Sequence, residues 1–435
     1  MSRIAVFPID AIGHLKSLLT AIMPLADDGR FDALMGFGRA FVGPAFRQAG
    51  FDFSPTMMDP RPADHGNDLR WKSFVRPTRD MAETMKAVLR FAPDVILYDC
   101  FSVYGRIAAA VTGKPSAAFV TMYGYGTLPE DFVRANSWER DDVQQANATF
   151  RGDFDVDLQA EGGLPVLFPS RDQTLVHAPA KLLNPLNPDR QPLLKGALKN
   201  SAPETPIGRD VDWKGVVPRT ADGSSGCDEA LLARVEKAKA DGASIVLFSL
   251  GTVISDFRYD TPVGGAPSGS AFLQRMLNGL FEAVEQDPRL FLVAAVGPRY
   301  LKSGHSHHPK NAVVLETVPQ AELLRRYVDV FITHHGANSQ AEAMLSGVGM
   351  VSLPGAGDQI ANARSAIANG VAVADWDLQD PFGTCSSSRL AAAIRQVLND
   401  ESIKCACRRL RDEIGLLHSE VPLGDRLLAL SRQPM

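Results

Sequence analysis

The chain has 435 residues, of which 45% are hydrophobic and 22% are charged, and its formal net charge is −5. This composition is that of a soluble globular protein, and the length predicts two domains. The negative net charge argues against a nucleic-acid-binding protein, which would present a basic face. No apolar run reaches the roughly 20 residues that a membrane-spanning helix needs, so no such helix is expected.

The five cysteines lack the paired spacing of a disulfide framework or a zinc cage. They are Cys100, Cys227, Cys385, Cys405 and Cys407. Cys405 and Cys407 lie in a Lys- and Arg-rich stretch and are interpreted as surface thiols, with a metal role as the alternative. The N-terminus carries only a short apolar run, which predicts a buried strand rather than a signal peptide. The expected location is therefore a reducing cytoplasm.

The first half alternates short β-branched or apolar runs with stretches of helical periodicity. The elements expected in chain order are a strand at 4–7, a helix near 15–28, strands at 33–37 and 94–99, a helix near 101–112 and a strand at 116–120. This is the βαβ rhythm of a parallel sheet covered by helices. Residues 54–72 and 122–210 are irregular and rich in Pro, Asn, Asp and aromatic residues, so binding loops are expected there.

The Gly- and Ser-rich segment 218–227 predicts a linker, after which the rhythm begins again. The elements expected are a helix near 228–241, a strand at 244–250, a loop at 253–267, a helix near 270–286, strands at 290–296, 312–316, 328–334, 349–354 and 370–375, and helices from about 387 onward. The predicted fold class is α/β, with two doubly wound Rossmann-like domains facing each other across a cleft. The domains are residues 1–217 and 228–435, and the last helix could cross back to the N-terminal domain.

Polar residues gather after the strand at 328–334, where a doubly wound sheet binds its ligand. His334 and His335 end the strand, and Gly336 opens a helix at which a large group could come close. Asn338 and Ser339 lie in the first turn, where the helix dipole and the backbone N–H groups suit phosphate. The alternative is a plain helix cap made by these side chains.

One further residue continues this helix face, and two more pairs of residues follow strands. Glu342 lies one turn deeper than Asn338 on the same helix face, where a carboxylate suits a pair of sugar hydroxyls. Gly251 and Thr252 follow the strand at 244–250, and Asp358 and Gln359 follow the strand at 349–354. The alternatives are an ordinary turn at Gly251 and a simple cap at Asp358.

His14 and Asp99 follow the first and fourth strands, whose carboxyl ends are neighbours in a doubly wound sheet. A carboxylate bonded to one imidazole nitrogen fixes the tautomer and supports the cation formed when the other nitrogen accepts a proton. The pair is therefore a candidate general base with its orienting partner, and a purely structural His14 is the alternative. Scattered Asp-x-Asp strings are attributed to chance, and no metal is expected.

The segment "THHGANSQAEAMLSGVGMVSLPGAGDQIANA" (333–363) resembles the donor-binding signature of family 1 glycosyltransferases, the UDP-glycosyltransferase superfamily. Further similar segments are "VPQAELL" (318–324), "SLGTV" (249–253), "IGHLKSLL" (12–19) and "LYDCF" (97–101). The resemblance, in particular to bacterial natural-product glycosyltransferases, implies the two-domain GT-B fold. It also implies a hexosyltransferase that needs no cofactor or metal and takes a UDP- or TDP-linked sugar as co-substrate.

The resemblance also implies a role for each matching residue. His334 would contact the α-phosphate of the donor. Asn338, Ser339 and Thr252 would hold the β-phosphate. Glu342 would bind the ribose hydroxyls, with Gln320 near the ribose and base, and Asp358 and Gln359 would bind the transferred sugar. His14 would deprotonate the acceptor and Asp99 would orient it. The chain departs from the pattern at His335, Gly349, Thr317 and Ser17. His335 replaces a small residue and predicts a bulkier phosphate loop, and Thr317 replaces a base-stacking tryptophan.

The expected function is inverting transfer of a sugar to a hydroxyl or amine of a small apolar or aromatic acceptor. The acceptor residues proposed from the irregular segments of the N-terminal half are Trp71, Phe74, Met122, Tyr123, Tyr125 and Trp138. Anchoring of those loops in the core is the alternative for each of them. Two other functions stay open: a nucleotide-sugar epimerase of the same architecture, and a non-catalytic sugar-nucleotide-binding partner of another transferase. The candidate general base His14 with its partner Asp99 argues against the non-catalytic binding partner.

Overall fold

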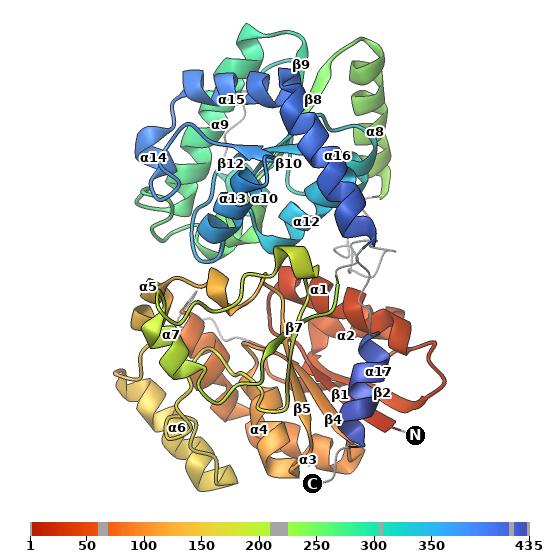
Figure 1. The fold of residues 1–435 in the computed structure, drawn as a ribbon, viewed down its shortest axis with the longest axis vertical. Helices are drawn as coiled ribbons and strands as arrows, with labels where there is room; N and C mark the ends of the chain where they lie inside the picture. Colours follow the sequence, from red (N-terminus) through yellow and green to blue (C-terminus); the bar gives the residue numbers. More distant parts are fainter. Residues whose placement is uncertain (1, 60–67, 209–224, 304–307, 417–421, 433–435) are drawn as a thin grey trace. The chain divides into compact units, whose positions relative to one another are not determined.

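The computed structural model describes residues 2–59, 68–208, 225–303, 308–416 and 422–432. The chain divides into two compact units, shown in Figure 1. The N-terminal unit comprises Met1–Pro218 and Leu417–Met435, and the C-terminal unit comprises Arg219–Leu416. Most of the predicted linker, residues 218–224, falls outside the described residues, and the first helix of the C-terminal unit begins at Ser225.

The N-terminal unit is built on a seven-stranded parallel sheet in the order β3-β2-β1-β4-β5-β6-β7. Its strands are β1 (Ser2–Phe7), β2 (Phe31–Arg39), β3 (Asp52–Met57), β4 (Val95–Asp99), β5 (Ser116–Val120), β6 (Gln173–Val176) and β7 (Glu204–Pro206). All residues of β4 and β5 are buried, as expected of central parallel strands covered on both faces. In the β1–β4 register Phe7 lies beside Tyr98, so the segments that follow these two strands begin at the same edge.

Helices and short helical turns connect these strands. The helices are α1 (Ile12–Ile22), α2 (Gly43–Gln48), α3 (Met81–Phe91), α4 (Val103–Thr112), α5 (Glu130–Ala135), α6 (Asp141–Phe154), α7 (Pro192–Ala197) and α17 (Leu423–Ser431). The short turns are η1 (Met23–Leu25), η2 (Ala40–Val42), η3 (Trp71–Val75), η4 (Arg76–Arg79), η5 (Tyr125–Thr127) and η6 (Ala180–Leu182). Helix α17 comes last in the chain, yet Leu427 and Leu430 belong to the core of the N-terminal unit together with Ile4 and Leu18.

The C-terminal unit has a six-stranded parallel sheet in the order β10-β9-β8-β11-β12-β13. Its strands are β8 (Ser244–Ser249), β9 (Leu290–Ala295), β10 (Ala312–Leu315), β11 (Val330–Thr333), β12 (Gly349–Ser352) and β13 (Ala372–Val373). Its helices are α8 (Ser225–Ala240), α9 (Gly269–Gln286), α10 (Gly297–Lys302), α11 (Gln320–Arg326), α12 (Ala337–Ser346), α13 (Gln359–Ala368), α14 (Pro381–Thr384), α15 (Ser387–Asn399) and α16 (Glu401–Leu416), with the short turn η7 at Val253–Phe257.

The predicted α/β class with two doubly wound, Rossmann-like units is confirmed, because both sheets are parallel and the strand order of each reverses at its first strand. The sequence patterns did not reveal β3, which extends into the predicted irregular segment 54–72, or the long helix α6, which lies within 122–210. Among the described residues, no helix combines the length and the apolar character that crossing a membrane would require.

Candidate functional site

His14 and Asp99 meet at the carboxyl edge of the N-terminal sheet. His14 lies in the first turn of α1, and its Nδ1 is 2.8 Å from Oδ2 of Asp99, the last residue of β4. The Asp99 side chain is 1% exposed, and its Oδ1 accepts a hydrogen bond from the Phe101 backbone N–H at 2.9 Å. The His14 side chain is 26% exposed. A buried, fixed carboxylate thus holds an imidazole that remains accessible, which is the geometry of a general base with its orienting group.

Thr121 is a third member of this cluster that the sequence patterns did not single out. It directly follows β5 and is 5% exposed. Its Oγ1 lies 2.8 Å from Nδ1 and 3.3 Å from Nε2 of His14, so the hydroxyl lies beside the ring. The rule that identified Asp99, a polar residue at the end of a strand next to β1, could have been extended one strand further to identify Thr121.

In the C-terminal unit, His334 directly follows β11 and packs between two glycines. A Cβ on Gly251 would stand 2.4 Å from Cε1 of His334, and a Cβ on Gly336 would stand 2.5 Å from its Nε2. Gly251 also adopts a φ of 63°, in the left-handed region. The space beside the Cα atoms of these glycines was predicted to admit a ligand. It is occupied by the imidazole of His334.

Burial sets the charge state of His334. The residue is 5% exposed, and its Nδ1 has no hydrogen-bond partner among the described residues. Burial lowers the pKa of His334 to about 4, against the raising influence of the nearby Ser249 backbone. The ring is therefore neutral near pH 7, and it would serve a phosphate as a hydrogen-bond donor rather than as a cation.

Helix α12 begins beside His334, and Gly336 is its N-cap residue. A glycine has no side chain, so no side chain at the N-cap position accepts a hydrogen bond from the first backbone N–H groups of the helix. Asn338 and Ser339 are half-buried in the first turn. The dipole of the ten-residue helix makes this end favourable for an anion.

Glu342, Gln320 and Ser339 form one contact cluster. Gln320, the first residue of α11, donates from Nε2 to Glu342 Oε2 at 2.6 Å and to Ser339 Oγ at 3.1 Å. Glu342 is 6% exposed. The structure thus brings together three residues for which the family resemblance implies neighbouring positions on a donor nucleotide.

Asp358 and Gln359 lie where the loop after β12 meets the start of α13. Asp358 is half-buried and its Oδ2 accepts a hydrogen bond from Asn362 Nδ2 at 2.9 Å. Gln359 is 3% exposed, and its Oε1 accepts from the backbone N–H groups of Gly355 at 2.8 Å and Ala356 at 3.1 Å. The loop therefore uses the carboxamide oxygen of Gln359, which leaves its NH₂ group as the part suited to a ligand. Thr252, the last of the predicted donor residues, is exposed at the start of η7.

The six predicted acceptor residues have packing roles in the N-terminal unit. Five of them are buried: Trp71, Phe74, Met122, Tyr123 and Tyr125. Trp138 is half-buried and donates from Nε1 to the Gly163 carbonyl at 2.9 Å, and its ring meets Phe74 edge-on at 5.3 Å. Their contact with an acceptor stays a prediction.

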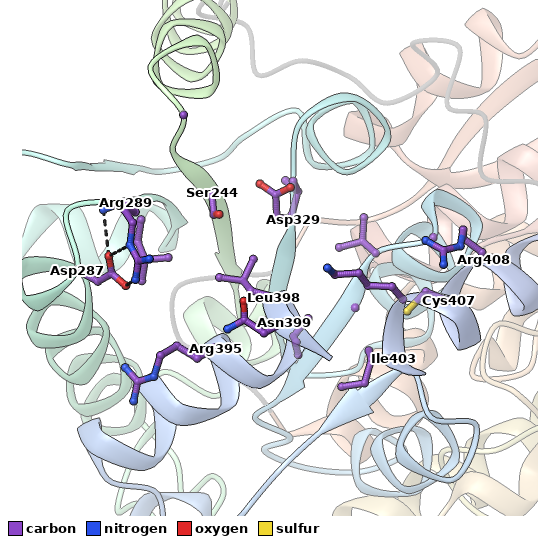
Figure 2. A pocket seen from close by; sticks show the side chains of 18 residues that line it. Ser244, Asp287, Arg289, Asp329, Arg395, Leu398, Asn399, Ile403, Cys407 and Arg408 are labelled. Carbon is purple, nitrogen blue, oxygen red and sulfur yellow. Dashed lines mark hydrogen bonds and ion pairs between the residues drawn. The ribbon is translucent and has the colours of Figure 1, made fainter. Parts of the chain in front are cut away.

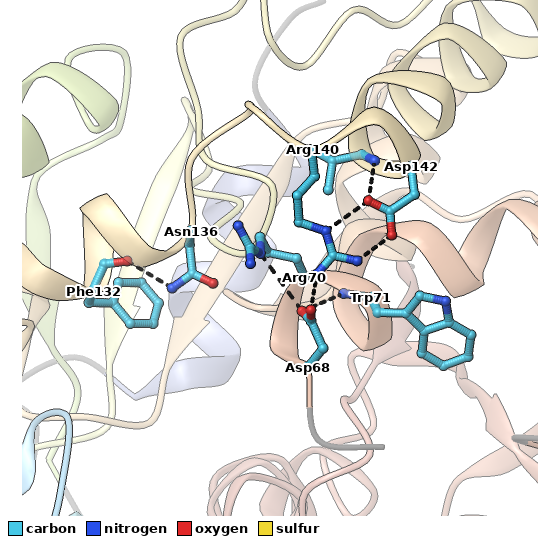
Figure 3. Close-up of polar contacts among 8 residues, drawn as sticks. Asp68, Arg70, Trp71, Phe132, Asn136, Arg140 and Asp142 are labelled. Carbon is cyan, nitrogen blue, oxygen red and sulfur yellow. Dashed lines mark hydrogen bonds and ion pairs between the residues drawn. The ribbon is translucent and has the colours of Figure 1, made fainter. Parts of the chain in front are cut away.

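An ion-pair network joins the segment that carries Trp71 to Arg140 and Asp142 at the start of α6, as Figure 3 shows. The Arg140 guanidinium contacts the carboxylates of both Asp68 and Asp142. Asp68 Oδ1 also accepts a hydrogen bond from the Trp71 backbone N–H at 3.2 Å. These segments are therefore ordered against each other by charge as well as by aromatic packing.

A cavity of about 490 Å³ opens elsewhere in the C-terminal unit (Figure 2). Ser244, Asp329 and Gly349 on its wall mark the amino ends of β8, β11 and β12. Parallel α/β sheets bind ligands at the opposite, carboxyl ends of their strands, where the predicted donor residues lie. This cavity is therefore not the candidate site. Among the described residues, no three His, Cys, Asp or Glu side chains gather as metal ligands would.

Residues 231–423 match the family described as UDP-glucoronosyl and UDP-glucosyl transferase. The match covers most of the C-terminal unit and ends at the start of α17. Rabbit (Oryctolagus cuniculus) UDP-glucuronosyltransferase 1A6 is 31% identical over 187 residues, which are 43% of this chain and 30% of the rabbit protein. Human (Homo sapiens) UDP-glucuronosyltransferase 1A1 is 29% identical over the same shares of the two chains. The chain therefore spans less than a third of the length of these curated relatives of the family.

Solved structures match the chain over both of its units. The glycotransferase of kitacinnamycin is 22% identical with a TM-score of 0.66, over 99% of this chain and 98% of that one. Spinosyn forosaminyltransferase SpnP is 17% identical with a TM-score of 0.68, and VinC, solved in complex with DTDP, is 16% identical with a TM-score of 0.64. Each of these two matches covers 99% of this chain and 100% of the other. At these identities the likeness establishes the fold, which is that of GT-B glycosyltransferases.

The prediction that His335 makes the phosphate loop bulkier is wrong. The imidazole of His335 is completely buried and bonds to Gln340 and Ser352 in the interior of the C-terminal unit. Its backbone has a φ of 60°, which turns the side chain away from the direction that an extended strand would give it. The ring therefore does not crowd the start of α12.

Proposed function

We propose that this chain is an inverting glycosyltransferase that moves a sugar from a UDP- or TDP-linked donor to a hydroxyl or amine of a small, apolar or aromatic acceptor. The pairing of His14 with the buried Asp99 carboxylate at 2.8 Å carries the proposal, because a protein that only binds nucleotide sugars has no need of an oriented base. The match of residues 231–423 to the family of UDP-glucoronosyl and UDP-glucosyl transferases supports the choice of donor.

The proposal assigns acceptor activation to the N-terminal unit. Asp99 accepts from the N–H at Nδ1 of His14, which leaves Nε2 as the atom that takes the acceptor proton. The imidazolium that forms is stabilised by the adjacent carboxylate. Such a base contributes typically ~10²–10⁴-fold to the rate.

The proposal assigns donor binding to the C-terminal unit. The start of α12 and the neutral His334 would donate hydrogen bonds to the diphosphate, whose charge grows as the sugar leaves. Glu342 and Gln320 would bind the ribose and base, and Asp358 and Gln359 would bind the sugar hydroxyls. Donors fixed in advance in this way stabilise a leaving diphosphate without reorganising during the reaction.

Replacing His14 with Ala tests the assignment. With UDP-glucose and TDP-glucose as donors and a panel of phenolic acceptors, we expect turnover to fall by roughly 10²-fold or more, since the base is lost. Nucleotide binding, measured by calorimetry with UDP and TDP, should stay within about twofold of that of the unchanged protein, because His14 is not part of the C-terminal unit. Transfer that survives at full rate in His14→Ala contradicts the mechanism.

The same assay separates the alternatives. An epimerase would change the stereochemistry of the donor sugar in the absence of any acceptor, which chromatography of the nucleotide sugars detects. A non-catalytic partner would bind nucleotide sugars and neither transfer nor epimerise. Glycosyltransferase VinC was solved with DTDP, and spinosyn rhamnosyltransferase SpnG was solved with thymidine diphosphate. These two complexes favour the use of TDP-linked donors in the assay from the start.

A further inference from the structure

His335 lies at the centre of a buried polar network in the C-terminal unit. The residue is completely buried, and both its ring nitrogens and both its backbone polar groups have partners. Ring Nδ1 lies 3.0 Å from Gln340 Oε1, and ring Nε2 lies 2.8 Å from Ser352 Oγ. The backbone N–H donates to Thr333 Oγ1 at 3.2 Å, and the backbone carbonyl accepts from Asn362 Nδ2 at 2.9 Å.

Burial fixes the protonation state of the ring, and its partners fix the tautomer. Burial lowers the pKa of His335 to about 3, so the imidazole is neutral near pH 7. A carboxamide oxygen can only accept, so Nδ1 carries the proton and donates to Gln340. Nε2 is then the acceptor for the Ser352 hydroxyl. A single tautomer satisfies both bonds, and the ring has one defined orientation.

The network connects two loops of the candidate site. Residues 334–336 form the loop that precedes α12, and His335 lies in its middle. Ser352 ends β12 and leads into the loop that carries Asp358. Asn362 donates from the same Nδ2 atom to the His335 carbonyl and to Asp358 Oδ2, both at 2.9 Å. A continuous chain of contacts therefore runs from the His334 loop to the Asp358 carboxylate.

The backbone of His335 shows that these contacts oppose a local cost. The left-handed region is disfavoured for a non-glycine residue relative to the extended conformation. A glycine would adopt the φ of 60° without that cost. The hydrogen bonds of the imidazole to Gln340 and Ser352 offset this conformational cost.

We propose that His335 is a positioning residue that couples the diphosphate loop to the sugar-binding loop, so that Asp358 is held in register with the donor only while the imidazole is present. This inference rests on the proposed function of the C-terminal unit as a donor site. His335 does not touch the donor. It acts through Ser352 and Asn362, and it makes recognition of the sugar depend on residue 335.

The test is a double-mutant cycle on donor binding. Calorimetry would give the dissociation constants of UDP, UDP-glucose, TDP and TDP-glucose for the unchanged protein, His335→Gly, Asp358→Ala and the double variant. The factor by which glucose improves binding over the bare nucleotide is the readout. Where His335 is kept, we expect Asp358→Ala to lower this factor on the order of fivefold or more. In the His335→Gly background, the same substitution should lower it by less than about twofold.

Asp155→Gly is the matched control. Asp155 is also a non-glycine residue in the left-handed region, with a φ of 58°, but it is exposed at the end of α6 in the N-terminal unit. Its replacement changes the chain entropy as His335→Gly does and removes no part of the network. It should leave the glucose factor unchanged. If His335→Gly fails to fold, His335→Asn replaces it, because Asn tolerates the left-handed backbone and lacks the ring.

The outcomes separate this inference from the proposed function. An equal cost of Asp358→Ala in both backgrounds overturns the positioning role while leaving the donor site in place. A merely structural role for His335 would lower thermal stability and leave that cost equal. Absence of binding by any of the four nucleotides to the unchanged protein overturns the proposed function itself, and this inference with it.

Discussion

At the scale of single residues, Gly251 shows how tightly the chain packs around His334. Replacing Gly251 with Ala should lower the free energy of unfolding by about 1 kcal/mol for the left-handed backbone and by roughly a further 1–3 kcal/mol for overpacking, since the new Cβ would stand 2.4 Å from the imidazole. Urea unfolding of the variant measures the sum. UDP binding should weaken as well, because the displaced ring belongs to the predicted diphosphate site.

Two other glycines serve as controls that separate the contributions. Gly242 has a φ of 85°, and a Cβ added there would have no neighbouring atom within 4 Å, so Gly242→Ala carries the backbone cost alone. Gly336 has a φ of −58°, and its Cβ would stand 2.5 Å from His334 Nε2, so Gly336→Ala carries the clash alone. Equal stability losses for Gly251→Ala and Gly242→Ala would show that the imidazole moves aside freely.

At the scale of elements, the topology rules placed His14 beside Asp99 correctly because parallel strands bring their carboxyl ends to one edge. Strand β3 was not predicted because its residues, "DFSPTM", include a proline and lack a clear apolar alternation. The orientation of His335 was not predicted for another reason. A left-handed residue directs its side chain by a backbone angle that no sequence periodicity reports.

Helix α17 gives a prediction about the N-terminal unit from a residue near the end of the chain. Leu427 is completely buried in the core that contains Ile4 and Leu18, so Leu427→Ala should lower the free energy of unfolding of this unit by about 2–5 kcal/mol. The loss comes from apolar contacts and from the cavity that the shorter side chain leaves. Denaturant unfolding followed by tryptophan fluorescence measures it.

Leu301→Ala is the control for this change, because Leu301 is 38% exposed in the C-terminal unit and should cost well under about 1 kcal/mol. The nucleotide affinity of Leu427→Ala should not change, since the predicted donor residues all lie in Arg219–Leu416. A Leu427→Ala protein as stable as the unchanged one would mean that α17 is not needed by the N-terminal core.

At the scale of the whole molecule, buried titratable groups should make the two units respond oppositely to acid. Burial holds the pKa of His334 at about 4 and that of His335 at about 3 in the C-terminal unit, below the ordinary value of 6.5. In the N-terminal unit burial raises the pKa of Asp80 and of Glu204 above their ordinary values. The first pair disfavours proton uptake by the fold, and the second pair favours it.

The sign follows from proton counting. Below pH 6.5 the unfolded chain protonates both histidines while the folded C-terminal unit does not, so its stability is fully present above pH 6.5 and falls as the pH drops toward 4. Each histidine should remove about 2 kcal/mol between roughly pH 7 and pH 5. The raised carboxyls contribute stability that is lost as the pH rises through their folded pKa, so acid does not weaken the N-terminal unit through them.

The difference can be measured through Trp376, which is 9% exposed in the C-terminal unit and donates to the Ser352 carbonyl at 2.9 Å. Its fluorescence is obtained by subtracting the signal of the Trp376→Phe variant. When the pH is lowered from about 7 to about 5, we expect the urea concentration at the midpoint reported by Trp376 to decrease. This decrease should be larger than that of the midpoint reported by the remaining tryptophans. His335→Asn removes one of the two buried imidazoles and should reduce that fall by about half. A midpoint for Trp376 that is the same at both pH values would show that the two histidines take up protons in the folded state, against the burial that the structure gives them.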